Sequence, residues 1–262
     1  MANRGLTDDA RGARARAWRH ATHAAVCDVL EPWAHGTVVR ATRYPRYYDF
    51  NAVRVEDDAQ MSQQALTAFA DDALRGLAHR GVDFELAQAG ETLRSGFLAS
   101  GWKATRLLWM RHEASPPPAP DVVIEEVAYD AVNDLRLAWH HEDSPSEDPT
   151  DFHSWAREIA LRRNTQLLAV REAGSLVAFA QLERDSGAAE IAQAHVHPSR
   201  RGAGLGRAVT LAAIAAAGDV RDLWICADDE GRPKELYTRL GFRPAWATIE
   251  FLQLPERVAA SE

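Results

Sequence analysis

Apolar positions along the chain alternate between the two-residue period of β-strands and the period of about 3.6 residues of amphipathic helices. In the N-terminal half, Trp18, Ala25 and Val29 fall on one face of a predicted helix over residues 8–30, which Pro32 ends. The pattern that follows predicts strands over 37–42 and 48–55, a helix over 61–80, a strand over 82–86, a helix over 91–100 and a strand over 103–110.

The C-terminal half opens with a predicted strand over 122–127 and a helix over 131–140. Pro233 suits the first turn of a later helix and Gly241 its left-handed end. The remaining pattern predicts a helix over 152–163, strands over 166–171, 176–182 and 188–196, a helix over 205–217, and strands over 223–227 and 245–252. Both halves therefore finish in the same order of strand, helix, strand, helix and strand.

A proline-rich segment, residues 114–120, is the one compositional break in the chain. Four of its residues are proline, which favours an extended and stiff linker. We therefore predict two α/β (α+β) domains, one over 1–113 and one over 121–262, joined by the linker 114–120.

Composition and charge narrow the functional classes. The chain has 262 residues, 46% hydrophobic and 26% charged, with a net charge of −8 that argues against generic nucleic-acid binding and allows cationic small molecules as partners. No apolar run approaches the roughly 20 residues that span a bilayer, and the N-terminus lacks the apolar core of a secretion signal, so we expect no membrane partner. The cysteines Cys27 and Cys226 lie in apolar segments, as expected for buried thiols in a reducing compartment; we expect a cytoplasmic protein, either a monomer or a homodimer.

The segment 195–207 combines the end of a predicted strand, a glycine-rich turn and the start of a helix. Glycines at 202, 204 and 206 remove Cβ atoms at alternate positions, so that backbone N–H groups can turn toward one point near the helix N-terminus. Arginines at 200, 201 and 207 add positive charge, and the combination predicts a site for a pyrophosphate or a similar dianion. The alternative is a tight corner without a ligand. The dinucleotide fingerprint needs a third glycine where Arg207 stands, and the P-loop needs a Gly-Lys-Ser/Thr that is absent.

The pattern Arg201-x-x-Gly204-x-Gly206 after Val-His-Pro resembles the acyl-CoA loop of the GNAT N-acetyltransferase superfamily. A second match follows, since Tyr237 and then Gly241-Phe242 before a last strand resemble the later motif of that family. The resemblance implies two GNAT-like domains, each a twisted, mixed and mostly antiparallel sheet flanked by helices. It also implies acetyl-CoA as co-substrate and acetyl transfer to a primary amine of a small molecule or peptide. A non-catalytic acyl-CoA-binding regulatory module is the alternative.

The same resemblance assigns roles to residues of the C-terminal domain. The backbone N–H of Val196 would serve as the oxyanion donor, and Tyr237 would protonate the departing thiolate. The positions expected to bind the co-substrate are Ala194, His195, Val196, Arg201, Gly202, Ala203, Gly204, Leu205, Gly206, Arg207 and Tyr237.

The general base stays open between two residues and water. Glu190 lies eleven residues before Arg201, a spacing that resembles the glutamate base of the histone-acetylating branch of the family. Strand alternation places His195, together with Gln193, on the opposite face from Glu190. His195 has the pKa for the task, and a chain of waters is the further alternative. His195 and His197 have no third ligand at a convincing spacing, so we expect no metal.

The N-terminal half can be aligned with the C-terminal half by placing Gly101-Trp102 on Gly241-Phe242. This alignment sets Phe97 on Tyr237 and puts residues 61–66, which include no glycine and no arginine, on the glycine loop. We therefore predict that the first half is a degenerate copy of the fold that has lost the anion site.

An acidic stretch over 141–151 falls between the first two helices of the second domain, a segment that borders the acceptor pocket in relatives of the resembled family. It would attract a protonated amine, and the alternative is a solvated acidic loop. Its carboxylates are Glu142, Asp143, Glu147, Asp148 and Asp151.

Overall fold

The computed structural model describes residues 10–115, 118–143, 149–185 and 187–255, and the chain divides into two compact units. Unit 1 holds the described residues up to Leu108, with Asp228–Glu230 and the segment that begins at Trp246. Unit 2 holds Trp109–Ala227 and Gly231–Ala245. By this division the predicted linker 114–120 lies within unit 2, and the last strand of the chain contributes to both units.

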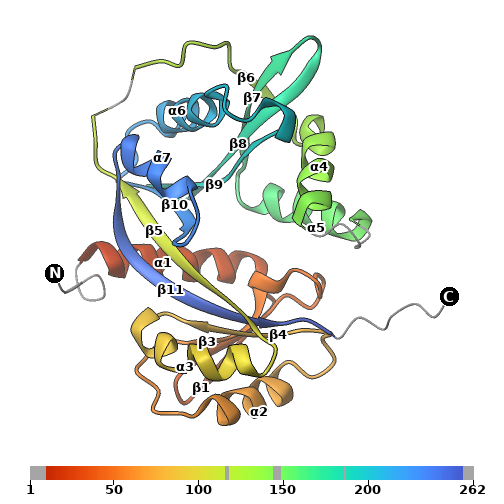
Figure 1. Ribbon diagram of the computed structural model, residues 1–262, viewed down its shortest axis with the longest axis vertical. Helices are drawn as coiled ribbons and strands as arrows, with labels where there is room; N and C mark the ends of the chain where they lie inside the picture. The colour runs from red at the N-terminus through yellow and green to blue at the C-terminus, as the bar shows by residue number, and fades with distance from the viewer. Residues whose placement is uncertain (1–9, 116–117, 144–148, 186, 256–262) are drawn as a thin grey trace. The chain divides into compact units, whose positions relative to one another are not determined.

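Unit 1 is built from a mixed sheet with helices on both faces (Figure 1). Strands β1, β2 and β3 pair antiparallel, β3 and β4 pair parallel across the helix α2, and β4 pairs antiparallel with β11. Its elements are α1 (Ala10–Val26), β1 (Val29–Trp33), β2 (Gly36–Arg40), the 3₁₀ turn η1 (Tyr48–Phe50), β3 (Asn51–Val55), α2 (Gln63–Ala73), β4 (Arg80–Phe84), α3 (Ala87–Ala99), the first part of β5 (Lys103–His112) and most of β11 (Phe242–Gln253).

The strand beside β4 comes from the far end of the chain. We predicted the strand over 245–252 as part of the C-terminal domain, whereas β11 pairs with β4, with Ile249 opposite Phe84. β11 fits there because its inward side chains are apolar: Ile249 and Phe251 are both fully buried in the unit 1 core. Phe97 of α3 stacks on Phe251 at 4.1 Å between ring centroids.

The first helix is shorter than expected. α1 ends at Val26, and Leu30 belongs to β1, which begins at Val29; the predicted continuation of the helix to Leu30 is therefore wrong, and its predicted start at residue 8 lies outside the described residues. Asp28 explains the change, because its carboxylate accepts hydrogen bonds from Thr42 and ties the start of β1 to the end of β2. The periodicity of apolar residues along the chain could not reveal this hairpin, because the hairpin brings together residues fourteen positions apart.

The face of the unit 1 sheet under α1 is charged. Arg19 of α1 donates to Asp83 of β4 and to Glu250 of β11, both at 2.8 Å. Burial raises the pKa of the Asp83 carboxyl to about 6 although Arg19 opposes the shift. An apolar cluster of unit 1 packs between α2, α3 and the sheet, and includes Leu66, Phe97 and Phe251.

Unit 2 repeats the order of strand pairing found in unit 1. Strands β6, β7, β8 and β9 pair antiparallel, and β9 pairs parallel with β10 across the helix α6. Its elements are β6 (Glu125–Val127), the 3₁₀ turn η2 (Tyr129–Val132), α4 (Asn133–Asp143), α5 (Thr150–Arg162), β7 (Gln166–Glu172), β8 (Ser175–Asp185), β9 (Ala188–Val196), the 3₁₀ turn η3 (Pro198–Arg200), α6 (Leu205–Ala217), β10 (Asp222–Asp228) and α7 (Pro233–Arg239). The bounds of β9 and α6 are those that the sequence predicted.

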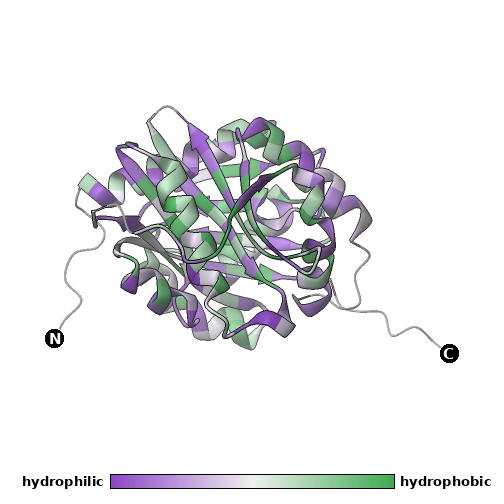
Figure 2. Cartoon of the chain, turned by 90° about the horizontal axis from the view of Figure 1, so that it is seen from above, coloured by the Kyte–Doolittle hydropathy of each residue, from purple (hydrophilic) through white to green (hydrophobic). Residues whose placement is uncertain are grey.

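Packing in unit 2 follows the apolar pattern. α6 is rich in Ala, Leu, Val and Ile and packs on β7, β8 and β9, while α4 contacts β8 and β9. Figure 2 shows apolar colour gathered on the strands and on the inward sides of the helices, and polar colour on the outward sides. In the part of the chain that the structure describes, no helix combines the length and the hydropathy needed to cross a bilayer.

The packing of α3 on β11 predicts opposite effects for two glycines of this helix. An alanine at Gly90 would place its Cβ 2.2 Å from Ile249 Cγ2 and 2.9 Å from Phe84. We therefore expect Gly90→Ala to lower the free energy of unfolding by about 1–3 kcal/mol, measured by urea denaturation.

Gly96→Ala is the matched control in the same helix. Its Cβ would lie 3.4 Å from Gln63 Cβ, an ordinary contact, so we expect no loss and up to about 1 kcal/mol of gain from helix propensity. Equal losses in the two variants would contradict the placement of β11 against α3.

Candidate functional site

An irregularity in β9 decides which side chains share a face of the unit 2 sheet. Glu190 pairs with Glu183 and Gln193 pairs with Gln181. Two residues of β9 therefore lie between these pairs where β8 has one, and Ala192 is the extra residue without a partner on β8. Such a β-bulge shifts the alternation of the bulged strand by one residue. Since cross-strand partners share a face, Glu190 lies on the same face as Gln193 and His195. The prediction that His195 and Gln193 lie opposite Glu190 is therefore wrong.

The bulge also marks the end of the pairing between β9 and β10. The parallel ladder runs from Ala188–Asp222 to Ile191–Ile225, and no pair is described beyond it. The N–H of His197 donates to Val177 of the β8 side at 2.9 Å. Because successive N–H groups point to opposite edges of a strand, the amides of Ala194 and Val196 point away from β8, on the edge that faces β10. Among the described residues the pairing with β10 ends before them.

The glycine turn after β9 leaves space around its backbone. Gly202 and Gly204 have φ angles of 83° and 79°, and a Cβ added to either would meet no atom within 4 Å. Gly204 is the N-cap of α6 and supplies no side-chain cap. The first hydrogen bond of the helix joins the Ala208 N–H to Gly204 O at 3.1 Å. The N–H groups of the turn before it, which include Leu205 and Gly206, precede this first bond, as expected at a helix N-terminus.

The three arginines of the turn differ in their contacts. Arg201 makes two hydrogen bonds of 2.6 Å to Glu142, and Arg200 pairs with Glu172 at 2.5 Å. Arg207 is exposed, and no ion pair is described for it among the described residues. Two of the three positive charges that we expected at the anion site are thus neutralised by carboxylates.

Tyr237 lies on α7, near the start of α6: Leu236, its neighbour in the chain, lies 3.9 Å from the Cβ position of Gly206. The Tyr237 side chain is buried, and burial raises the pKa of its hydroxyl to about 12. The hydroxyl therefore carries its proton at neutral pH and can only donate it.

His195 is enclosed on the same face of β9. Trp139 of α4 stacks on it with ring centroids 5.1 Å apart and planes 11° apart, and only 5% of the residue is exposed. Among the residues that the structure describes, neither its Nε2 atom nor the buried Oε1 atom of Gln193 has a hydrogen-bond partner. Burial, followed by the charge of Arg201, lowers the pKa of His195 to about 4, so the ring is neutral at neutral pH and is a weaker base than an ordinary histidine. The expectation that the pKa of His195 suits the task of a general base is therefore wrong.

A buried polar network lies beside His195 and was missed by the sequence analysis. Arg136 donates to Gln181 at 2.9 Å, Gln181 to Glu183 at 3.0 Å, and Arg163 to the same carboxylate at 3.1 Å. Gln181 and Glu183 in the otherwise apolar run of β8 are the signal that could have revealed it, because buried polar groups need partners. Its arginines come from α4 and from the end of α5, and only the tertiary structure brings them to this strand.

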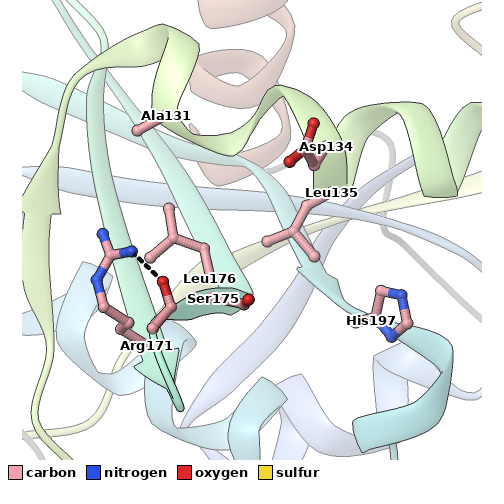
Figure 3. A pocket seen from close by; sticks show the side chains of 8 residues that line it. Ala131, Asp134, Leu135, Arg171, Ser175, Leu176 and His197 are labelled. Carbon is pink, nitrogen blue, oxygen red and sulfur yellow. Dashed lines mark hydrogen bonds between the residues drawn. The ribbon is translucent and has the colours of Figure 1, made fainter.

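A pocket of about 360 Å³ lies between the first turn of α4 and the β7–β8 hairpin (Figure 3). Leu135 and Leu176 line it as parts of an apolar cluster. His197, at the end of β9, is the one residue of the segment 195–207 in its wall, and its Nδ1 contacts the Ser199 hydroxyl at 2.8 Å. The pocket therefore lies at the loop end of β9, and no motif in the sequence predicts it.

Metal ligands gather elsewhere. Among the described residues, His20, Glu56 and Glu85 of unit 1 are the group whose ligand atoms lie close enough together for a metal ion. Both carboxylates already face Arg54, whose Nε lies 2.9 Å from Glu56 and 3.5 Å from Glu85. A neighbouring guanidinium makes this group an ion-pair cluster that is poorly suited to a cation. His195 and His197 belong to no such group.

The acidic stretch 141–151 is only partly described. Glu142 ends in the contact with Arg201, Asp143 is the last residue of α4, and Asp151 lies in the first turn of α5. Glu147 and Asp148 lie outside the described residues.

Comparison with known proteins gives one family and several relatives. A family model described as "Acetyltransferase (GNAT) family" matches residues 129–242. A mycothiol acetyltransferase of Actinosynnema mirum is 29% identical over 197 residues, which cover 68% of this chain and 66% of that protein. The chain therefore matches slightly less than two thirds of the length of this relative.

Solved structures share the fold at low identity. A functionally unknown conserved protein of Staphylococcus epidermidis superposes with a TM-score of 0.70 at 15% identity, over 87% of this chain and 94% of that one. A tandem GNAT protein from the clavulanic acid biosynthesis pathway superposes with a TM-score of 0.51 at 14% identity, over 78% and 75%.

The enclosure of His195 predicts its titration. Because the folded pKa lies below the ordinary value, the ring should stay neutral from about pH 8 to about pH 5, and its NMR signals should not move across that range. Because the folded state binds this proton less tightly than the unfolded state does, His195 contributes to the free energy of unfolding above about pH 6.5. That contribution is lost as the pH falls toward 4.

Two variants serve as controls for this titration. His195→Gln identifies the signal by its loss, and Trp139→Ala, which removes the stacked ring, should raise the pKa toward the ordinary value. A wild-type midpoint near 6.5 would show that the ring is open to water.

Proposed function

We propose, from the premise that residues 129–242 are a GNAT-family acetyltransferase domain, that this chain transfers an acetyl group from acetyl-CoA to a primary amine of a small molecule or peptide. The observation that carries the proposal is the end of the described β9–β10 ladder at Ile191 and Ile225, on the strand that leads to the glycine turn and to a helix N-terminus without a side-chain cap. A long, narrow donor could lie along the end of β9 with its anionic end at the glycine turn. The name of the Actinosynnema mirum relative supports acetyl transfer as the reaction.

The residues present fit the parts of acetyl-CoA. The amides of the turn 202–207 and the exposed Arg207 would hold the diphosphate. The outward amides of Ala194 and Val196 would hydrogen-bond to the amide-bearing arm, in the manner of an added strand. When bound, the co-substrate supplies an activated acetyl group as its thioester.

The chain's own groups would then serve the transfer. As the amine nitrogen bonds to the acetyl carbon and the carbon–sulfur bond breaks, the Val196 N–H stabilises the negative charge on the carbonyl oxygen. The Tyr237 hydroxyl, which keeps its proton at neutral pH because burial raises its pKa to about 12, would hydrogen-bond to the departing sulfur and give it the proton as negative charge develops there.

Two groups remain as acceptors of the proton that leaves the amine. Glu190 is the first candidate and His195 the second; the bulge puts both on one face of β9, and His195 is neutral. Water that joins the two groups would let them act in sequence. A comparison of Glu190→Gln with His195→Gln separates them, because the base should control the acidic limb of the rate profile.

Unit 1 lacks the features on which this proposal rests. The N-terminus of α2 is capped by Ser62, whose hydroxyl accepts from the Ala65 N–H at 3.2 Å. The parallel pairing of β3 with β4 continues past the strand end, where the Glu85 N–H donates to Val55 O at 2.9 Å. Phe97, which aligns with Tyr237, stacks in the core. We propose that unit 1 binds no acetyl-CoA.

Donor binding can be measured first. Acetyl-CoA and coenzyme A should raise the melting temperature, and Gly204→Glu should abolish the rise because a carboxylate would stand among the amides of the turn. Gly76→Glu is the matched control: Gly76 also has a positive φ (91°) and an open Cβ position, but it lies in unit 1. No response of the wild-type protein to any CoA compound would refute the proposal.

Turnover is tested separately on a panel of amines, with detection of the released thiol. Tyr237→Phe should reduce kcat by about 10²-fold or more, with the dissociation constant for acetyl-CoA within about twofold of wild type. Donor binding without turnover on any amine would favour the non-catalytic acyl-CoA-binding module instead.

A further inference from the structure

The ion pair between Arg201 and Glu142 joins two elements that are 59 residues apart in the chain. Glu142 lies in the last turn of α4, and Arg201 begins the glycine turn. Both N–H···O distances are 2.6 Å, and the side chains are 49% and 39% exposed. A two-pronged pair of this geometry directs the guanidinium away from the amides of the turn and toward α4.

The same corner contains the enclosed histidine. Trp139, which stacks on His195, precedes Glu142 by three residues and therefore projects from the same side of α4. The charge of Glu142 acts on His195 and so does that of Arg201. The corner thus holds one carboxylate, one guanidinium and one aromatic pair.

His195 supplies an independent sign of a ligand at this corner. The residue is 5% exposed, and its Nε2 atom has no hydrogen-bond partner in the part of the chain that the structure describes. A buried polar atom without a partner loses hydrogen-bond energy unless a ligand or water restores it. The Nε2 atom can therefore accept a hydrogen bond from a ligand, and Glu142 lies near enough for its charge to act on His195.

The partner of Arg201 can be exchanged. An exposed ion pair contributes little because water and salt compete with it. A diphosphate at the neighbouring amides carries more charge than one carboxylate and offers a guanidinium the same two-pronged contact. Departure of Arg201 would leave the Glu142 carboxylate without this partner.

We propose, on the basis of the proposed function, that Glu142 selects acceptors that carry a second cationic group beside the reacting amine. Before the donor binds, Arg201 pairs with the Glu142 carboxylate. When the donor binds, its diphosphate takes the place of that carboxylate as the partner of Arg201. Donor and acceptor then bind with positive coupling, although they contact different atoms. A diamine is the simplest acceptor of this class.

The test compares Glu142→Gln with Glu172→Gln, which removes the partner of the adjacent Arg200. Calorimetry with coenzyme A gives the first readout. Glu142→Gln should tighten coenzyme A binding by about two- to fivefold more than Glu172→Gln does, because it releases Arg201. The melting temperatures of the free variants verify that both fold.

The second readout is coupling to the acceptor. Butane-1,4-diamine should bind wild-type protein about two- to fivefold more tightly in the presence of saturating coenzyme A than in its absence. The monoamine n-butylamine should show no such gain in affinity. Glu142→Gln should lose the gain, and Glu172→Gln should keep it.

The outcomes separate the two proposals. If wild-type protein fails to bind coenzyme A, the proposed function itself is wrong. If it binds coenzyme A but the diamine shows no gain, or Glu142→Gln keeps the gain, the role of Glu142 is wrong and the proposed function stands.

Discussion

One extra residue in β9 controls the geometry of unit 2. Because Ala192 has no partner on the unbroken strand β8, the side chains after it change faces, and Glu190 joins His195 on the side covered by α4. At the same position the described pairing with β10 ends. Bulges disrupt the local ladder and are over-represented at sheet edges and next to active sites, where they re-aim side chains.

The face that receives these side chains is held by buried charge. Glu183 sits between Gln181 and Arg163, and Arg136 closes the network while its guanidinium lies 3.8 Å from the Tyr129 ring centre. Buried ion pairs of this kind gain little net stability, since desolvation offsets their attraction. Their value is in orientation: each member has few alternative partners, so the wall beside His195 keeps one arrangement.

The two units have a similar order of strand pairing but differ in the hydrogen bonding of their main-chain N–H groups. In unit 1 the hydroxyl of Ser62 accepts a hydrogen bond from a main-chain N–H at the start of α2. The parallel ladder between β3 and β4 likewise pairs main-chain groups at the strand end. The apolar half of β11 fills the core of unit 1, with Trp246 donating to Glu85 O at 2.8 Å. In unit 1 the described main-chain N–H groups of Ala65 and Glu85 therefore have partners at the positions that correspond to the helix start and strand end of unit 2.

The sequence by itself determined the glycine turn, the bounds of β9 and α6 and the general strand order, because these depend on local residue chemistry and on periodicity. Only the tertiary structure decided the face of Glu190, the pairing of β11 with β4 and the partner of Arg201. The reason is physical. A bulge changes no residue type and leaves the apolar pattern of β9 intact. The apolar pattern of β11 likewise does not specify which strand it pairs with. The contact between Arg201 and Glu142 joins positions far apart in the chain, so that no local pattern encodes it.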